Sequence, residues 1–108
     1  MRDFVYVKDV AKVCVYLMKY RKAQGIFNLG SGKARTFNDL ALNVFQASGR
    51  TPEIQYIDTP IDIRDKYQYF TEADMQKLGS IGYTESFYTL EQGCLDYVQN
   101  YLIPQSYF

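Results

Sequence analysis

The sequence predicts a small α/β domain in which short strands alternate with about four helices. Strand-like and helix-like patterns follow one another at a spacing of about 25 residues, and a capping-box pattern precedes three of the helical stretches. The 108 residues contain no repeat, low-complexity tract or linker, so we expect one domain over residues 1–108. Three short strands are too few for a complete doubly wound sheet, and the fold is therefore expected to be part of one.

The first predicted unit is a strand followed by a helix. Residues 4–7 are apolar and β-favouring, which predicts the strand. Asp9 is placed to cap the helix, which is expected to run to about residue 21. Apolar residues recur at helical spacing along this stretch and define its inner face: Val10, Val13, Cys14, Leu17 and Met18.

The second predicted unit repeats this order. Residues 26–29 predict a short strand, and the glycines at residues 30–32 predict a turn. Thr36 and Asp39 form a capping box, in which each side chain accepts a hydrogen bond from the other residue's backbone amide. The helix that they start is expected to end at Gly49 and to bury Phe37, Leu40, Ala41, Val44 and Phe45.

The last part of the chain predicts one more strand and two helices. Residues 54–57 alternate in polarity and predict the strand, which Pro60 follows. Thr71 with Asp74 predicts a capped short helix through residue 78, and Thr89 with Gln92 predicts the start of the final helix. The residues expected to end these two helices are Gly79 or Gly82, and Pro104.

Composition excludes several function classes. The formal net charge is zero and the pI is about 6.2, which argues against binding to nucleic acid or to an anionic membrane. The chain contains no histidine and two cysteines, so it cannot assemble a zinc site or a histidine-based triad alone. We expect Cys14 and Cys94 to be buried free thiols in a cytoplasmic protein; the alternative is a disulfide. No apolar run reaches the length of a membrane span.

A catalytic centre is not expected within this chain. The turn Gly30-Ser31-Gly32 begins like a dinucleotide fingerprint, but Arg35 stands where the third glycine belongs. No tyrosine is followed by a lysine four positions later, and the serines have no histidine to activate them. We therefore predict no catalytic residue, no metal site and no cofactor site here.

Two segments remain as candidate binding sites. Arg2 stands just before a predicted strand, where it could reach an anion; the alternative is a surface ion pair with Asp3. Tyr67 lies in a polar and aromatic loop and follows two basic residues, Arg64 and Lys66. For that loop the alternative is a solvated segment whose neighbouring aromatic side chains, Tyr69 and Phe70, are tucked into the core.

The same two segments resemble a known family. The stretches RDFVYVKDVAKV, GIFNLGSGKARTFNDLA, IQYIDTP and KYQYFTEADMQKL occur in order, followed by GY and TLEQG. Together they resemble the C-terminal portion of the extended short-chain dehydrogenase/reductases that epimerise or dehydrate nucleotide sugars. The resemblance spans essentially the whole chain, and KYQYFTEAD narrows it to one kind of epimerase. It implies a small substrate-binding α/β portion without the Rossmann half, and the abrupt start at residues 1–4 also suggests a piece of something longer.

The resemblance also implies how the chain works. Arg2 matches an arginine that reaches the diphosphate of the substrate, here an ADP-sugar, and Tyr67 matches a substrate-contacting tyrosine. NADP and the catalytic Tyr and Lys would belong to the Rossmann half, so this chain alone is expected to bind no cofactor and to be inactive. A homo-oligomer is expected. The alternatives are the same domain of another nucleotide-sugar epimerase, dehydratase or reductase, or a free-standing, non-catalytic binding module.

Overall fold

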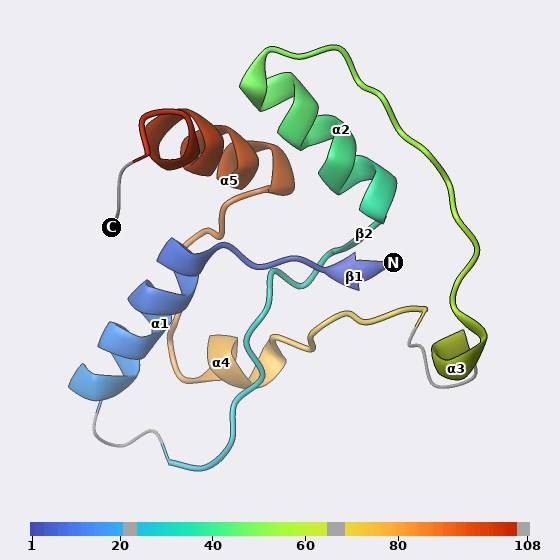
Figure 1. Cartoon of the computed structure of the whole chain (residues 1–108). Helices are drawn as coiled ribbons and strands as arrows, with labels where there is room; N and C mark the ends of the chain where they lie inside the picture. The colour runs from blue at the N-terminus through green and yellow to red at the C-terminus, as the bar shows by residue number, and fades with distance from the viewer. Residues whose placement is uncertain (21–23, 65–68, 106–108) are drawn as a thin grey trace.

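The computed structural model describes residues 1–20, 24–64 and 69–105. The chain is helix-rich and contains a two-stranded antiparallel sheet in the described part (Figure 1). Strand β1 (Arg2–Asp3) pairs with β2 (Ala34–Arg35) in a register that places Arg2 opposite Arg35 and Asp3 opposite Ala34. In chain order the elements are β1 (Arg2–Asp3), α1 (Val7–Lys19), β2 (Ala34–Arg35), α2 (Phe37–Ser48), α3 (Ile61–Arg64), α4 (Gln76–Ser80), α5 (Leu90–Tyr97) and the π-helical extension η1 (Val98–Leu102).

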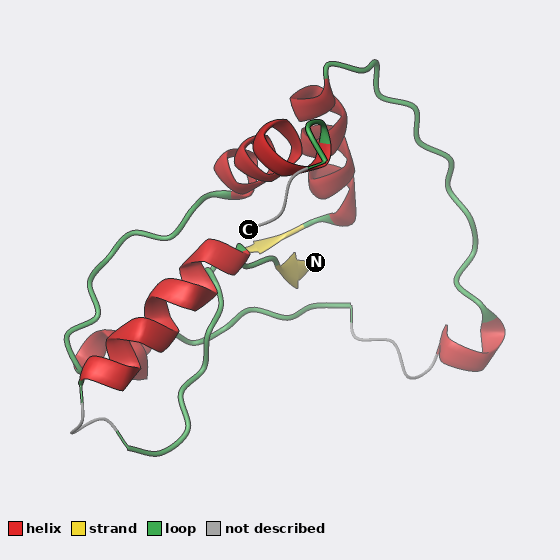
Figure 2. Cartoon of the chain, turned by 60° about the vertical axis from the view of Figure 1, so that its left-hand side comes forward, coloured by secondary structure: helices red, strands yellow, loops and turns green. Residues whose placement is uncertain are grey.

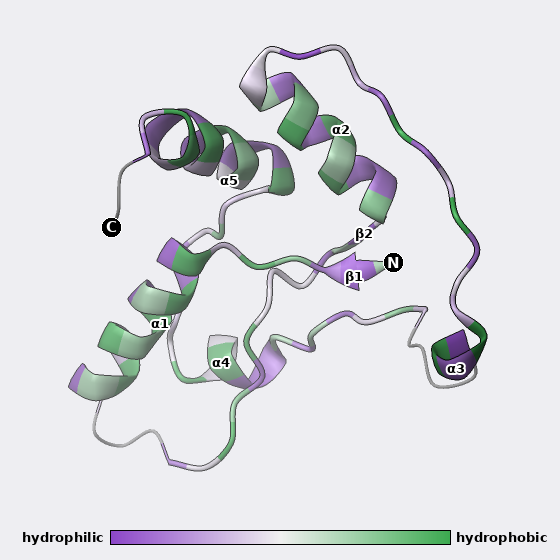
Figure 3. Ribbon diagram, in the orientation of Figure 1, coloured by the Kyte–Doolittle hydropathy of each residue, from purple (hydrophilic) through white to green (hydrophobic). Residues whose placement is uncertain are grey.

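Helices lie on both sides of the small sheet. Helices α2 and α5 pack against each other on one side, while α1 and α4 lie on the other (Figures 1 and 2). The hydrophobic core cluster on the side of α1 and α4 consists of the buried residues Val13, Leu78 and Tyr83. On the other side, Ala47 of α2 and Val98 of η1 are buried. Figure 3 shows apolar and polar residues alternating along α1, α2 and α5; some of the apolar side chains expected to face inward, Met18 and Phe37 among them, are exposed.

Two of the three predicted capping boxes are confirmed. Thr36 Oγ1 accepts a hydrogen bond from the Asp39 amide at 3.0 Å, and the Asp39 carboxylate accepts one from the Thr36 amide at 3.1 Å. Thr89 and Gln92 make the same reciprocal pair at the start of α5. Gly49 ends α2 with a φ of 73°, as expected of a left-handed C-cap. Each cap residue contributes about 1 kcal/mol of stability.

The predicted strand at residues 4–7 and the predicted cap at Asp9 are wrong. The ladder includes only Arg2–Asp3 at this end, and α1 already begins at Val7. Asp9 lies inside the first turn of α1, is 1% exposed and accepts a hydrogen bond from the Tyr88 amide at 2.8 Å. The Asp9 carboxylate therefore binds a backbone amide 79 residues away, although its local position predicts that it caps the helix.

The predicted strands at residues 26–29 and 54–57 are also absent from the ladder that the structure describes. A strand is stabilised by its neighbours, and the only strands described are β1 and β2. The predicted segments carry some of the most exposed apolar side chains, Ile26 at 86% and Ile57 at 84%. The sheet is thus smaller than predicted, and its two strands are antiparallel.

Three further expectations need correction. Thr71 does not cap a helix: its hydroxyl accepts a hydrogen bond from the Asp3 amide at 3.4 Å, and α4 begins only at Gln76. Both cysteines are free, as predicted, but Cys14 is exposed on α1 while Cys94 is half-buried. The alternative for the loop around residue 67, in which Tyr69 and Phe70 are tucked into the core, is wrong in that respect, because these side chains are 62% and 60% exposed. None of the described helices is long and apolar enough to cross a membrane.

The molecule is open rather than compact. Its radius of gyration is 16.5 Å, whereas a compact domain of this length has about 13 Å. Its accessible surface is 8384 Å², against about 6,200 Å² expected from its mass. Figure 1 shows one reason, because the connection from α2 to α3 runs along the outside. The exposed surface includes large apolar side chains, among them Met18, Ile26, Ile57 and Ile61.

We predict that this exposed apolar surface makes the isolated chain self-associate and bind an apolar fluorescent dye. Sedimentation and dye fluorescence over a wide range of chain concentration measure both effects. A chain that stays monomeric throughout and does not enhance dye fluorescence would contradict the prediction.

Candidate functional site

The carboxylate of Asp3 joins three segments that are distant in the sequence. One oxygen accepts hydrogen bonds from the Ser31 amide at 2.7 Å and the Ser31 hydroxyl at 2.5 Å. The other accepts from the amides of Gly32 and Ala73, each at 3.0 Å. Burial raises the pKa of Asp3, but these hydrogen bonds outweigh that effect, and the net shift is downward. We call this arrangement the Asp3 junction.

The Asp3 junction decides what the turn at residues 30–32 can bind. Its amides at Ser31 and Gly32 converge on a carboxylate of the same chain, as the amides of a phosphate loop converge on phosphate. Gly30 is buried, and a Cβ there would lie 2.6 Å from the Asp3 carboxylate. The prediction of a turn is therefore confirmed, and this turn does not fit a dinucleotide, because its donors are already engaged.

The junction also brings the two predicted binding segments side by side. The Met1 amino group donates to the Tyr69 carbonyl, and the Thr71 amide donates to the Met1 carbonyl at 3.0 Å. Residues 69–73 thus run next to β1, which carries the half-buried Arg2. Tyr67 itself lies outside the described residues, two positions before Tyr69.

The face of the sheet that carries Arg2 is rich in charge. Successive side chains of a strand point to opposite faces, so Arg2 shares a face with its cross-strand partner Arg35 and not with Asp3. Arg35 donates to Glu91 at 2.5 and 3.1 Å and to Asp39 at 3.4 Å. It ties the first turn of α2 to the first turn of α5. The hydrogen bonds from Arg35 lower the pKa of Glu91 to about 2.

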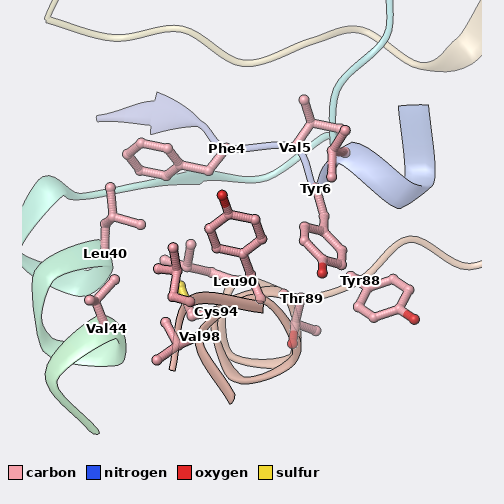
Figure 4. Close-up of a pocket in the computed structure, with 14 residues that line it drawn as sticks. Phe4, Val5, Tyr6, Leu40, Val44, Tyr88, Thr89, Leu90, Cys94 and Val98 are labelled. Atoms are coloured by element: carbon pink, nitrogen blue, oxygen red, sulfur yellow. The ribbon is translucent and has the colours of Figure 1, made fainter. Parts of the chain in front are cut away.

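A separate pocket of about 540 Å³ lies between α2, α5 and the stretch from β1 to α1 (Figure 4). Its walls are mostly apolar, and Figure 4 shows the Tyr6 ring at its edge beside Tyr88. The Tyr6 hydroxyl donates to Asp96 at 2.5 Å, and Lys8 pairs with the same carboxylate at 2.7 Å. Burial, and then Asp96, raise the pKa of Tyr6, so this phenol is held as a neutral donor. The pocket offers shape and apolar contact rather than acid–base chemistry.

Sequence reasoning did not find Asp96 or the role of Asp3. Asp96 lies 90 residues from Tyr6, and no local pattern links the two. For Asp3 there was one usable signal, because an acidic side chain adjoins Arg2 and a Gly-Ser-Gly turn follows later. Within the residues described, no group of three or more acidic or cysteine side chains is placed to hold a metal.

The chain is similar in sequence to three known proteins. The chain is 51% identical over 102 residues to proteins from two strains of Nitratidesulfovibrio vulgaris, and 42% identical over 111 residues to one from Fusobacterium nucleatum. All three are named ADP-L-glycero-D-manno-heptose-6-epimerase. This chain is similar in sequence to a C-terminal part of these epimerases.

The coverage of the match is unequal. It takes in 94–97% of this chain but 32–33% of each ADP-L-glycero-D-manno-heptose-6-epimerase, so the chain spans about a third of their length. No protein-family model matches the chain.

The ion pair at Arg35 predicts how stability responds to acid. Glu91 has a pKa of about 2 in the folded chain and an ordinary value of 4.5, so the pair stabilises the fold above about pH 4.5. This contribution is lost as the pH falls towards 2. We expect Glu91→Gln to flatten the fall in Tm between about pH 5 and pH 2, measured by circular dichroism.

Glu53→Gln is the matched control, because Glu53 is exposed in the connection after α2. This variant should follow the wild-type curve. Equal acid profiles for Glu91→Gln and the wild type would show that the pair contributes nothing in solution.

Proposed function

We propose that this chain is the substrate-binding part of an epimerase that inverts C6 of ADP-D-glycero-D-manno-heptose. The observation that carries the proposal is the placement of β1, with Arg2, beside residues 69–73, which follow the tyrosine-containing KYQ element. The sequence similarity to ADP-L-glycero-D-manno-heptose-6-epimerases supports the same reading. In this proposal residues 1–108 form one small domain of an extended short-chain dehydrogenase/reductase.

Arg2 and Tyr67 are the residues proposed to hold the substrate. A guanidinium presents a rigid fork of donors that suits the oxygens of a diphosphate, and its charge is permanent. The neighbouring Arg35 is balanced by Glu91 and Asp39, so its role is to fix the starts of α2 and α5. Tyr67 would add a hydrogen bond from its phenol.

The redox chemistry belongs to a different part of the proposed enzyme. Epimerisation of this kind uses NADP to oxidise the sugar side chain and to reduce it again. The turn at residues 30–32 does not fit a dinucleotide, since the Ser31 and Gly32 amides bind Asp3. We therefore assign NADP to a Rossmann half, and this chain binds and orients the sugar nucleotide.

The alternative substrate is another nucleotide sugar. A contact from Arg2 to the diphosphate would be the same for every nucleotide sugar, so it does not distinguish one sugar from another. We also propose a homo-oligomer, supported by the exposed apolar surface. A cytoplasmic location is proposed because both cysteines are free thiols.

The first test restores the proposed missing half. This chain replaces the matching third of the Nitratidesulfovibrio vulgaris epimerase, and C6 epimerisation of the ADP-heptose is followed by NMR. We expect the fusion to be active and the 108-residue chain alone to show neither turnover nor tight binding of NADP. Turnover by the isolated chain would contradict the division of labour proposed here, and binding of the ADP-heptose without turnover by the fusion would favour a non-catalytic module.

The second test removes the proposed contacts in the fusion. Arg2→Ala should lower substrate affinity ten- to hundredfold, because a strong charge-assisted hydrogen bond is worth about 1.5–3 kcal/mol. Tyr67→Phe should cost less, about 0.5–1.5 kcal/mol, because only the hydroxyl is lost. Calorimetry with the ADP-heptose measures both.

Arg50→Ala serves as a charge-matched control, since Arg50 is exposed beyond the end of α2. It should bind substrate like the wild type, and none of the three variants should shift Tm much. If Arg2→Ala destabilised the fold and left affinity unchanged, Arg2 would have only a structural role.

A further inference from the structure

We propose that Asp3 is a positioning residue for substrate binding, whose carboxylate fixes the strand that carries Arg2 against the turn at residues 30–32 and against residues 69–73. This inference rests on the proposed function, because it concerns how the Arg2 site is held. Asp3 does not touch the substrate in this proposal. It acts through the backbone of β1.

The hydrogen bonds of Asp3 are suited to this task. Both carboxylate oxygens accept two hydrogen bonds each, and three of the four donors are backbone amides, at Ser31, Gly32 and Ala73. Backbone donors belong to the path of the chain itself, so the carboxylate sets the distance between segments rather than the rotamer of one side chain. Its ionised form, favoured by these donors, accepts stronger hydrogen bonds than a neutral group.

The space around the carboxylate is equally restricted. A Cβ at Gly30 would approach the Asp3 carboxylate to 2.6 Å and the Ala73 Cβ to 2.7 Å. The turn and residue 73 therefore meet at Asp3 with no room for a larger side chain at position 30. The two-residue ladder between β1 and β2 is too short to impose this arrangement alone.

The position of Arg2 follows from that of Asp3. The two residues are neighbours in β1, and the pleat sends their side chains to opposite faces. With Asp3 anchored in the junction, Arg2 is directed to the face of Arg35, next to the first turns of α2 and α5. Loss of the anchor would leave the Arg2 side chain intact but no longer held in this place.

The experiment measures ADP binding by the 108-residue chain, using ¹H–¹⁵N spectra of labelled protein. We expect Asp3→Asn to weaken ADP binding about tenfold. It should also weaken the nuclear Overhauser effect between backbone protons of Arg2 and Arg35, which reports their pairing across the two strands. Because Asp3 acts through Arg2, the double variant Arg2→Ala with Asp3→Asn should bind ADP no more weakly than Arg2→Ala. A purely structural role would not produce this non-additivity.

Two further variants keep the test decisive. Asp74→Asn makes the same change of charge at an exposed residue outside the junction, and it should bind ADP like the wild type. Ser31→Ala deletes only the hydroxyl donor to Asp3, so it should show a smaller effect of the same kind even if Asp3→Asn fails to fold. The circular dichroism of the helices monitors folding.

The outcomes separate this inference from the proposed function. Wild-type affinity in folded Asp3→Asn, or additive effects in the double variant, would overturn the positioning role while Arg2 keeps its own. If ADP fails to bind the wild type, or binds equally well to Arg2→Ala, the proposed site at Arg2 is wrong. In that case the nuclear Overhauser effect between Arg2 and Arg35, compared between Asp3→Asn and the wild type, still shows whether Asp3 holds β1 in place.

Discussion

The arrangement of this chain depends on one carboxylate. Asp3 accepts hydrogen bonds from residues 28 and 70 positions away, and it does so at the end of a ladder only two residues long. Such a ladder is too short to hold three segments together by itself. The Asp3 carboxylate holds the three segments together through its hydrogen bonds. The close approach at Gly30 also leaves no room for a side chain larger than glycine beside this carboxylate.

A second set of charges ties the helices to this centre. Arg35 in β2 binds the first turns of α2 and α5, and Asp96 in α5 binds Tyr6 and Lys8 at the start of α1. Apart from the Arg35–Asp39 pair, which is four residues apart, each contact joins elements distant in the sequence, in a molecule with a small buried core. The result is a scaffold with the ladder that carries Arg2 and Arg35 at its middle (Figure 1), which suits the proposed role in substrate binding.

Local sequence rules succeeded where the partner is local. The boxes at Thr36 and Thr89 join residues three apart, and both are present. The same rules failed at Asp9 and Thr71, because a backbone amide elsewhere in the chain takes each side chain. The predicted strands at residues 26–29 and 54–57 failed for a related reason, since pairing requires a neighbouring strand that local patterning does not provide. The family resemblance predicts Arg2 as a binding residue. The hydrogen bonds of the Asp3 junction, in contrast, could be found only in the structure.

The most direct test of this account is the titration of Asp3, read at its donors. The amide proton shifts of Ser31, Gly32 and Ala73 are followed by NMR as the solution is acidified. We expect the three amides to shift together with one midpoint, below the ordinary pKa of 3.8 for an aspartate, because the hydrogen bonds lower the pKa of Asp3. Amides that shift independently of one another, or at an ordinary midpoint, would show that Asp3 does not join these segments in solution.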